Sequence, residues 1–145
     1  MNITYRNFQN EGIIALDTQM MRPRMVSSHL ILQNGKAAFV DVGASPSTPN
    51  LLKGLAEHSL SKEDVEYVIV THVHLDHAGG VGMLMNQLPN AKLLVHPRGS
   101  RHMIDPSKLI AGATAVYGPD EMSKTYGEIL PVSEDLSLIH ISEPT

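Results

Sequence analysis

The amino-acid sequence predicts an α/β (α+β) protein in which a mixed sheet carries helices on one face. Two observations predict this class. Short apolar segments bounded by turn residues fill the first third of the chain and indicate strand hairpins. Helical and strand patterns then alternate, which adds αβ units to the sheet. With 145 residues, 42% of them hydrophobic, the chain has the size and composition of one globular domain.

The early strands follow from their branched apolar residues and from one turn signal. Asn34-Gly35 is a strong two-residue hairpin signal, so the segments on either side of it should pair as antiparallel strands, the second ending at Asp41. The Met-rich loop TQMMRPRMVS precedes this hairpin, and we expect its methionines to pad the edge of the core. The predicted strands are residues 12–17, 28–33 and 36–40.

Helix signals dominate the rest of the chain. Thr48 is a plausible N-cap and Pro49 fits the first position of a helix that runs to His58. Ser61 and Asp64 form a capping-box pattern for one short turn. Further on, the patterns predict strands at 66–72 and 91–96, a helix at 81–88 stopped by Pro89, and a mostly helical stretch at 97–127 broken at Pro106 and Gly118-Pro119.

Composition excludes several classes of function. The chain has no cysteine, so disulfides, thiol catalysis and cysteine-based metal sites are excluded. A net charge of −4 argues against a nucleic-acid partner, and apolar runs such as YVIV are too short for a membrane span. The N-terminus lacks a basic start followed by an apolar core, so we expect a cytoplasmic protein without a secretory signal.

The strongest functional signal is VTHVHLDHAGG at 70–80, directly after a buried strand. Imidazole nitrogens and carboxylate oxygens are zinc ligands, and a rigid sheet holds the loop that leaves it. In an extended segment, positions 72, 74 and 76 share one side. His72 and His74 then suit one metal, and Asp76 and His77 can turn toward a second. A single His at a strand end is usually structural, but three with an Asp at this spacing favour a metal site.

Other polar residues carry a weaker signal. His96 and His102 flank PRGSR, where Arg98 and Arg101 would suit an anionic substrate. A helix start with solvated basic residues is the favoured interpretation of that segment. We interpret His29 and His58 as structural or surface residues, and Tyr117 and Tyr126 as packing residues.

The motif THVHLDHAGG resembles the His-x-His-x-Asp-His signature of the metallo-β-lactamase-fold hydrolases. LILQNGKAAFVDVG is similar to the early hairpin of that superfamily, and LPNAKLLVHPRGSRHMIDPSKLIAGATAVYG to a subgroup of bacterial metal-dependent hydrolases. The resemblance implies an αββα sandwich, of which this chain would be the N-terminal half. It also implies that His72 and His74 bind the first metal and that Asp76 and His77 bind the second. Asp41 would support the ligands without binding metal.

The activity implied by this resemblance is metal-dependent hydrolysis of a small-molecule substrate. Two divalent ions, zinc first and iron or manganese as alternatives, would share a hydroxide that attacks an ester, thioester, lactone or phosphodiester. Asp76 would act as the catalytic residue by orienting that hydroxide and accepting its proton. The alternatives are an iron-dependent oxidoreductase of the same fold and a catalytically inactive fragment.

The resemblance also implies further ligands, which we expect beyond the end of this chain. His140 lacks the Gly-His context of such a ligand and is interpreted as incidental. We therefore expect residues 1–135 to form an incomplete N-terminal part of the domain, inactive alone. Because SLIHISEPT resembles translated sequencing-adapter sequence, residues 136–145 are interpreted as an atypical, artefactual tail, with a natural terminus as the alternative.

Overall fold

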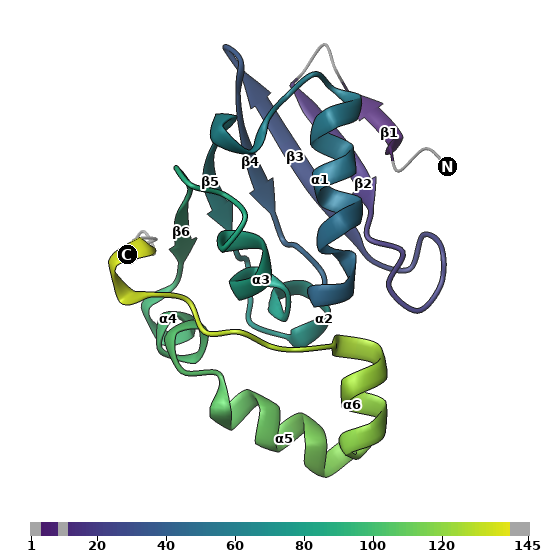
Figure 1. The fold of residues 1–145 in the computed structure, drawn as a ribbon, viewed down its shortest axis with the longest axis vertical. Helices are drawn as coiled ribbons and strands as arrows, with labels where there is room; N and C mark the ends of the chain where they lie inside the picture. The colour runs from purple at the N-terminus through teal and green to yellow at the C-terminus, as the bar shows by residue number, and fades with distance from the viewer. Residues whose placement is uncertain (1–3, 9–11, 140–145) are drawn as a thin grey trace, which may run out of the picture.

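The structure, a computed structural model, describes residues 4–8 and 12–139 (Figure 1). Its seven strands form one sheet in the order β1 to β7, so each strand lies beside its neighbour in sequence. The first three pairings are antiparallel and the last three are parallel, so the sheet is mixed, as predicted. The strands are Thr4–Phe8 (β1), Ile13–Asp17 (β2), Ser27–Gln33 (β3), Lys36–Val40 (β4), Val65–Ile69 (β5), Lys92–Val95 (β6) and Ser137–Ile139 (β7).

The hairpin between β3 and β4 turns at the predicted dipeptide. Asn34 and Gly35 have φ values of 53° and 77°, the left-handed pair that a tight two-residue turn requires. Gln33 and Lys36 face each other across the turn. The hairpin fixes the register of β4, whose last residue, Val40, precedes Asp41.

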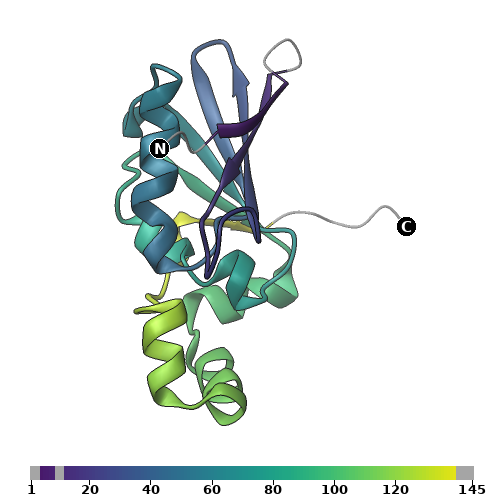
Figure 2. The ribbon, with the colours of Figure 1, turned by 90° about the vertical axis from the view of Figure 1, so that its right-hand side faces the viewer.

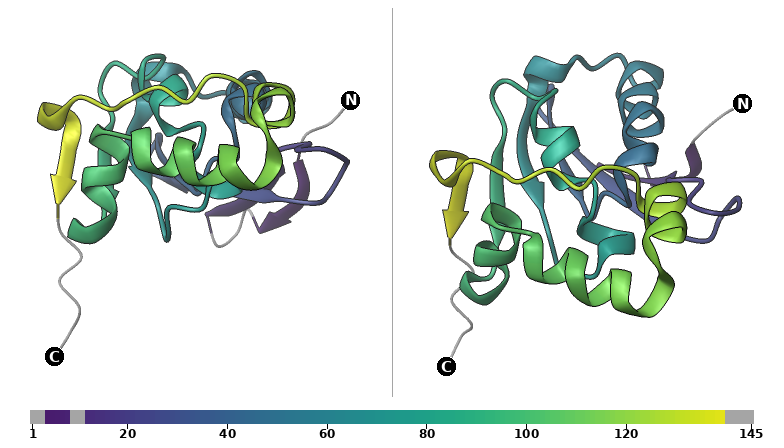
Figure 3. Two further views of the ribbon diagram at one scale, coloured as in Figure 1. Left: turned by 90° about the horizontal axis from the view of Figure 1, so that it is seen from below. Right: turned by 60° about the horizontal axis from the view of Figure 1, so that its bottom comes forward.

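The helices agree with the predicted breaks at Pro106 and Gly118-Pro119. In the edge-on view, α1 lies along one side of the strands (Figure 2). α4, α5 and α6 lie beyond one end of the sheet, at the bottom of Figure 1, and come forward when the molecule is seen from below (Figure 3). The helices are Thr48–Glu57 (α1), Leu75–Ala78 (α2), Val81–Met85 (α3), Pro97–Ile104 (α4), Ser107–Tyr117 (α5) and Pro119–Tyr126 (α6).

The two faces of the sheet differ in burial. On β3, Leu30 is fully buried, whereas the next residue, Ile31, is 38% exposed. His29 and Tyr67 are also exposed. The core therefore lies between the sheet and its helices on one side. Its largest side chains include Ile14, Leu16, Leu30, Phe39, Val68 and Leu93 from the strands and Leu51, Leu55 and Leu84 from the helices.

Several element ends differ from the predicted ones. β5 pairs with β6 only as far as Ile69, so the strand ends three residues before His72. α3 ends at Met85 rather than residue 88, and Ser47, not Thr48, is the N-cap of α1. The capping box is confirmed, because the backbone N–H of Ser61 donates to the carboxylate of Asp64 at 2.9 Å.

Two strands, β1 and β7, were not predicted. TYRNF in β1 offers only two apolar residues, and β7 falls in the segment interpreted as a tail. His140 lies outside the described residues. No helix in the described part of the chain is long and apolar enough to cross a membrane.

Candidate metal centre

The predicted ligands lie beyond the end of β5, in a loop that passes into a short helix. His72 and His74 are exposed on the loop, and Asp76 and His77 lie on α2. The backbone N–H groups of His77 and Ala78 both donate to the carbonyl of His74, at 2.9 and 2.8 Å, and so close the first turn of this helix. The expectation of one extended segment through residue 76 is therefore wrong.

The end of β4 holds this segment through the main chain. Asp41 has a φ of 54°, a left-handed conformation that aspartate tolerates better than most residues. The Asp41 N–H donates to the carbonyl of Ile69 at 2.9 Å. The Val42 N–H donates to the carbonyl of His77 at 2.8 Å. The residues that follow β4 are thereby tied both to the end of β5 and to the backbone of α2.

Gly80 permits the close approach of these two segments. A Cβ at this position would lie 2.7 Å from the carbonyl carbon of Ala44. The N–H of Gly80 donates to the carbonyl of Gly43 at 2.9 Å. The glycine after the histidine motif thus packs backbone against backbone, as its lack of a side chain allows.

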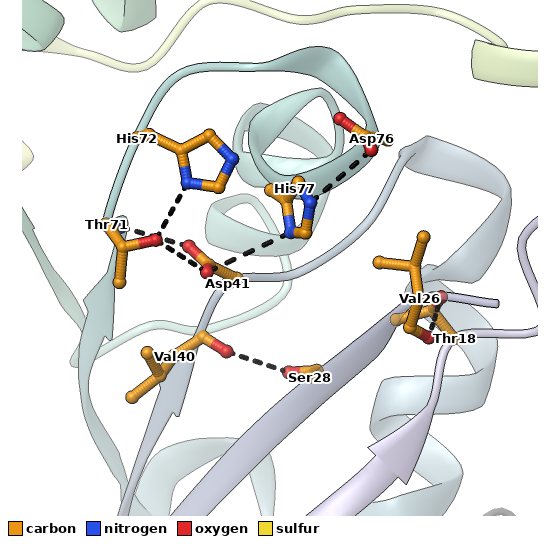
Figure 4. A network of polar contacts seen from close by, with 9 residues as sticks. All are labelled: Thr18, Val26, Ser28, Val40, Asp41, Thr71, His72, Asp76 and His77. Atoms are coloured by element: carbon orange, nitrogen blue, oxygen red, sulfur yellow. Dashed lines mark hydrogen bonds and ion pairs between the residues drawn. The ribbon is translucent and has the colours of Figure 1, made fainter. Parts of the chain in front are cut away.

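A chain of hydrogen bonds joins Asp41 to His72 through Thr71 (Figure 4). The Thr71 N–H donates to Oδ1 of Asp41 at 3.0 Å, and the Thr71 hydroxyl donates to Oδ2 at 2.7 Å. Because that hydroxyl has only one proton, its contact of 2.9 Å with Nδ1 of His72 must use an imidazole N–H as the donor. The network therefore assigns the tautomer of His72 whose Nε2 has a free lone pair.

Thr71 was not among the predicted site residues. The signal for it was its position, between the end of the buried strand and the first histidine, where a hydroxyl can reach both the neighbouring strand and the imidazole. Asp41, in contrast, was expected to support the ligands without binding metal. In the structure its carboxylate contacts Thr71 and lies 3.9 Å from Nδ1 of His77.

The four predicted ligands meet in pairs. The ring centroids of His72 and His74 are 5.0 Å apart, and those of His72 and His77 are 4.4 Å apart. Nε2 of His77 lies 3.4 Å from Oδ2 of Asp76. Among the residues that the structure describes, no three His, Asp or Glu side chains are arranged to hold a metal ion.

The donor set fits a divalent cation that prefers nitrogen and oxygen ligands. Nδ1 of His77 is buried without a hydrogen-bond partner, an unusual state for a polar atom. Imidazole nitrogens and a carboxylate are donors that zinc, iron and manganese accept. Because these residues meet in pairs, they can supply part of a coordination shell and need further ligands to complete it.

His96 and the two tyrosines that were singled out from the sequence have structural partners. Nδ1 of His96 accepts the backbone N–H of Arg98 at 3.1 Å, so this histidine caps α4. The rings of Tyr117 and Tyr126 lie 6.3 Å apart. Burial raises the pKa of the Tyr126 hydroxyl above 10.0, with smaller contributions from Tyr117 and from the negative charge of Asp76.

A mixed sheet with helices on one face and a His/Asp cluster beyond its strand ends defines an α/β protein with a candidate metal centre. The sequence model of the metallo-β-lactamase superfamily matches residues 21–145. The chain therefore belongs to the metallo-β-lactamase superfamily. No curated protein matches it significantly.

Solved structures share the fold at low sequence identity. MEM-A1, a subclass B3 metallo-β-lactamase from a soil metagenome library, is 21% identical, with a TM-score of 0.62 over 90% of this chain and 43% of its own. The metallo-β-lactamase of Cronobacter sakazakii with the HARLDQ motif is 20% identical, with a TM-score of 0.59 over 87% of this chain and 44% of its own. The chain thus spans less than half the length of these relatives.

Proposed function

We propose that the chain carries the first metal ligands of a metal-dependent hydrolase. Superfamily membership supports this proposal, and the observation that carries it is the chain Asp41–Thr71–His72, which leaves Nε2 of His72 free beside the rings of His74 and His77. A metal-binding imidazole commonly has its other nitrogen held in this way.

We propose His72 and His74 as ligands of one ion, and Asp76 and His77 as ligands of a second. The proposed ions are zinc, with iron or manganese as alternatives. When bound, such ions supply Lewis acidity and an activated water. The carboxylate of Asp76 would accept a proton during the reaction. Nε2 of His77 lies beside Oδ2 of Asp76 and would orient this carboxylate.

The proposed reaction is hydrolysis of an ester, thioester, lactone or phosphodiester. These four residues cannot complete two coordination shells. We therefore propose that this chain alone binds metal at less than full occupancy and hydrolyses substrate weakly or not at all.

The test is metal content after purification and equilibration with zinc, measured by elemental analysis. The His72→Ala variant should lose bound zinc, because it lacks the Nε2 lone pair that the hydrogen-bond network of Asp41 and Thr71 leaves free in the wild type. His29→Ala is the matched control, since this exposed histidine lies on β3 away from the motif. Equal zinc in both variants and the wild type would refute the proposed centre. Iron retained in preference to zinc, with oxygen consumption, would favour the oxidoreductase alternative.

A further inference from the structure

A cavity of about 370 Å³ opens beside two of the proposed ligands. Residues 73–76 of the motif form one wall, with His74 and Asp76 among them. The other walls come from α5 and α6, which lie beyond the end of the sheet (Figure 1). A group placed in this cavity would lie directly against the proposed reacting centre.

The α5 wall is apolar, although only Leu109 of the helix packs against the main core, and it does so while partly buried. None of its residues is buried, despite the sequence LIAGATAVY. Leu109, Ala113 and Tyr117 are spaced by four residues, so they share one side of the helix, and all three line the cavity. Apolar side chains gathered in a concave site beside a few polar groups are typical of ligand pockets.

Two tyrosines line the cavity. Tyr117 ends α5 and Tyr126 ends α6, and their rings are tilted by 45° at 6.3 Å. Aromatic rings at this separation form a stable, largely apolar wall. Tyr117 is still 55% exposed, so its ring has surface left for a ligand to cover.

The charge of the cavity favours a neutral ligand. Among the described residues that line it, none is Lys or Arg, and Asp76 contributes a negative charge. A bound phosphodiester is normally held by cationic side chains. Within the cavity an anion would lie near the Asp76 carboxylate without a cationic side chain, whereas a neutral apolar group would meet Leu109, Ala113 and the two tyrosine rings.

We propose that this cavity binds the non-polar acyl or aryl group of a neutral carboxylic ester, thioester or lactone. Tyr117 and Tyr126 then determine specificity by covering that group, and an anionic group is disfavoured within the cavity itself. This inference rests on the proposed hydrolase function and narrows its substrate class.

The experiment uses two probes with the same apolar groups and different charge. Hexananilide is a neutral amide with a hexanoyl chain and a phenyl ring, and phenyl hexyl phosphate is an anionic diester with a hexyl chain and a phenyl ring. Each is titrated into the metal-free full chain, with binding followed by amide NMR shifts. We expect hexananilide to shift the resonances of Ala113 and Tyr117 and to bind about tenfold more tightly than the phosphate.

Variants locate the binding. Tyr117→Ala should weaken hexananilide binding about tenfold by removing apolar contact area. Ala113→Phe should abolish binding by filling the cavity. Val116→Ala is the matched control, because Val116 is 75% exposed on the same helix and does not line the cavity. Equal effects of the variants at 116 and 117, or equal affinity for the two probes, would overturn the inference.

The two proposals fail separately. Zinc that is retained through His72, together with no hexananilide binding, would overturn the specificity inference and leave the proposed centre standing. Hexananilide binding in a chain whose zinc content does not depend on His72 would overturn the proposed function, and with it the assignment of the cavity to a substrate.

Discussion

The carboxylate of Asp41 accepts two hydrogen bonds from Thr71, one from its backbone N–H at 3.0 Å and one from its hydroxyl at 2.7 Å. This pair joins the ends of β4 and β5, two parallel neighbours in the sheet. The hydroxyl also contacts His72, so the pair sets the protonated nitrogen of that imidazole.

Thr71→Val should therefore weaken zinc binding while preserving side-chain shape. We expect a loss of about 10- to 100-fold in affinity, the range typical of residues that orient a metal ligand. Competition with a chromophoric chelator measures it. Thr71→Ser keeps the hydroxyl and should bind like the wild type. Wild-type affinity in the valine variant would show that the hydroxyl does not prepare His72.

Gly80→Ala should destabilise the fold, because the new methyl group would lie 2.7 Å from main-chain atoms of Ala44. Overpacking of this kind costs about 1–3 kcal/mol in the free energy of unfolding. Gly112→Ala is the control, since a Cβ there meets nothing within 4 Å and the residue is in the middle of α5. That change should stabilise by about 0.5–1 kcal/mol. Urea denaturation measures both, and the same sign for the two variants would contradict the close approach at Gly80.

The two faces of β3 should respond differently to truncation. Leu30→Ala removes a fully buried side chain and should cost about 2–5 kcal/mol in unfolding free energy. Ile31→Ala, at the next residue, changes a side chain that is 38% exposed and should cost about 1 kcal/mol or less. Chemical denaturation of the two variants compares the faces directly. A larger loss at Ile31 would mean that the exposed face is covered in solution.

The capping box at Ser61 and Asp64 should give stability a dependence on acid pH. Hydrogen bonds from the backbone N–H and hydroxyl of Ser61 lower the pKa of the Asp64 carboxyl below 3.8. A lowered folded-state pKa stabilises the protein above the unfolded value, and this contribution is lost as pH falls through the folded value. The wild type should thus exceed Asp64→Asn in stability at neutral pH, and the two should converge as the pH falls below 3.8. Urea denaturation at a series of pH values tests this, and a constant difference would contradict it.

The sequence could predict the elements whose signals are local. Asn34-Gly35 specified the hairpin, and Ser61 with Asp64 specified a capped turn. The end of β5 could not be predicted, because it depends on where pairing with β6 stops at Leu94 rather than on the composition of residues 66–72. The helix at residues 75–78 was missed for a related reason, since it is tied to β4 through Val42.

The sequence showed which residues make up the candidate site, but it did not show the hydrogen bonds and packing contacts that hold them. Spacing identified His72, His74, Asp76 and His77 as a set, and these remain predicted ligands. The role of Thr71 depends on Asp41, thirty positions earlier in the chain, and on the left-handed backbone that turns this aspartate toward β5. The cavity at Tyr117 likewise forms only when α5 and the motif meet.

The strand order β1 to β7 means that translation order equals pairing order. As a nascent chain leaves the ribosome, each strand finds its partner already made, and the hairpins at the amino end can form before the histidine motif has been synthesised. The edge of β6 must then wait for about forty residues, including all of α4, α5 and α6, before β7 reaches it. This strand order is compatible with extension of the sheet from its amino end as synthesis proceeds.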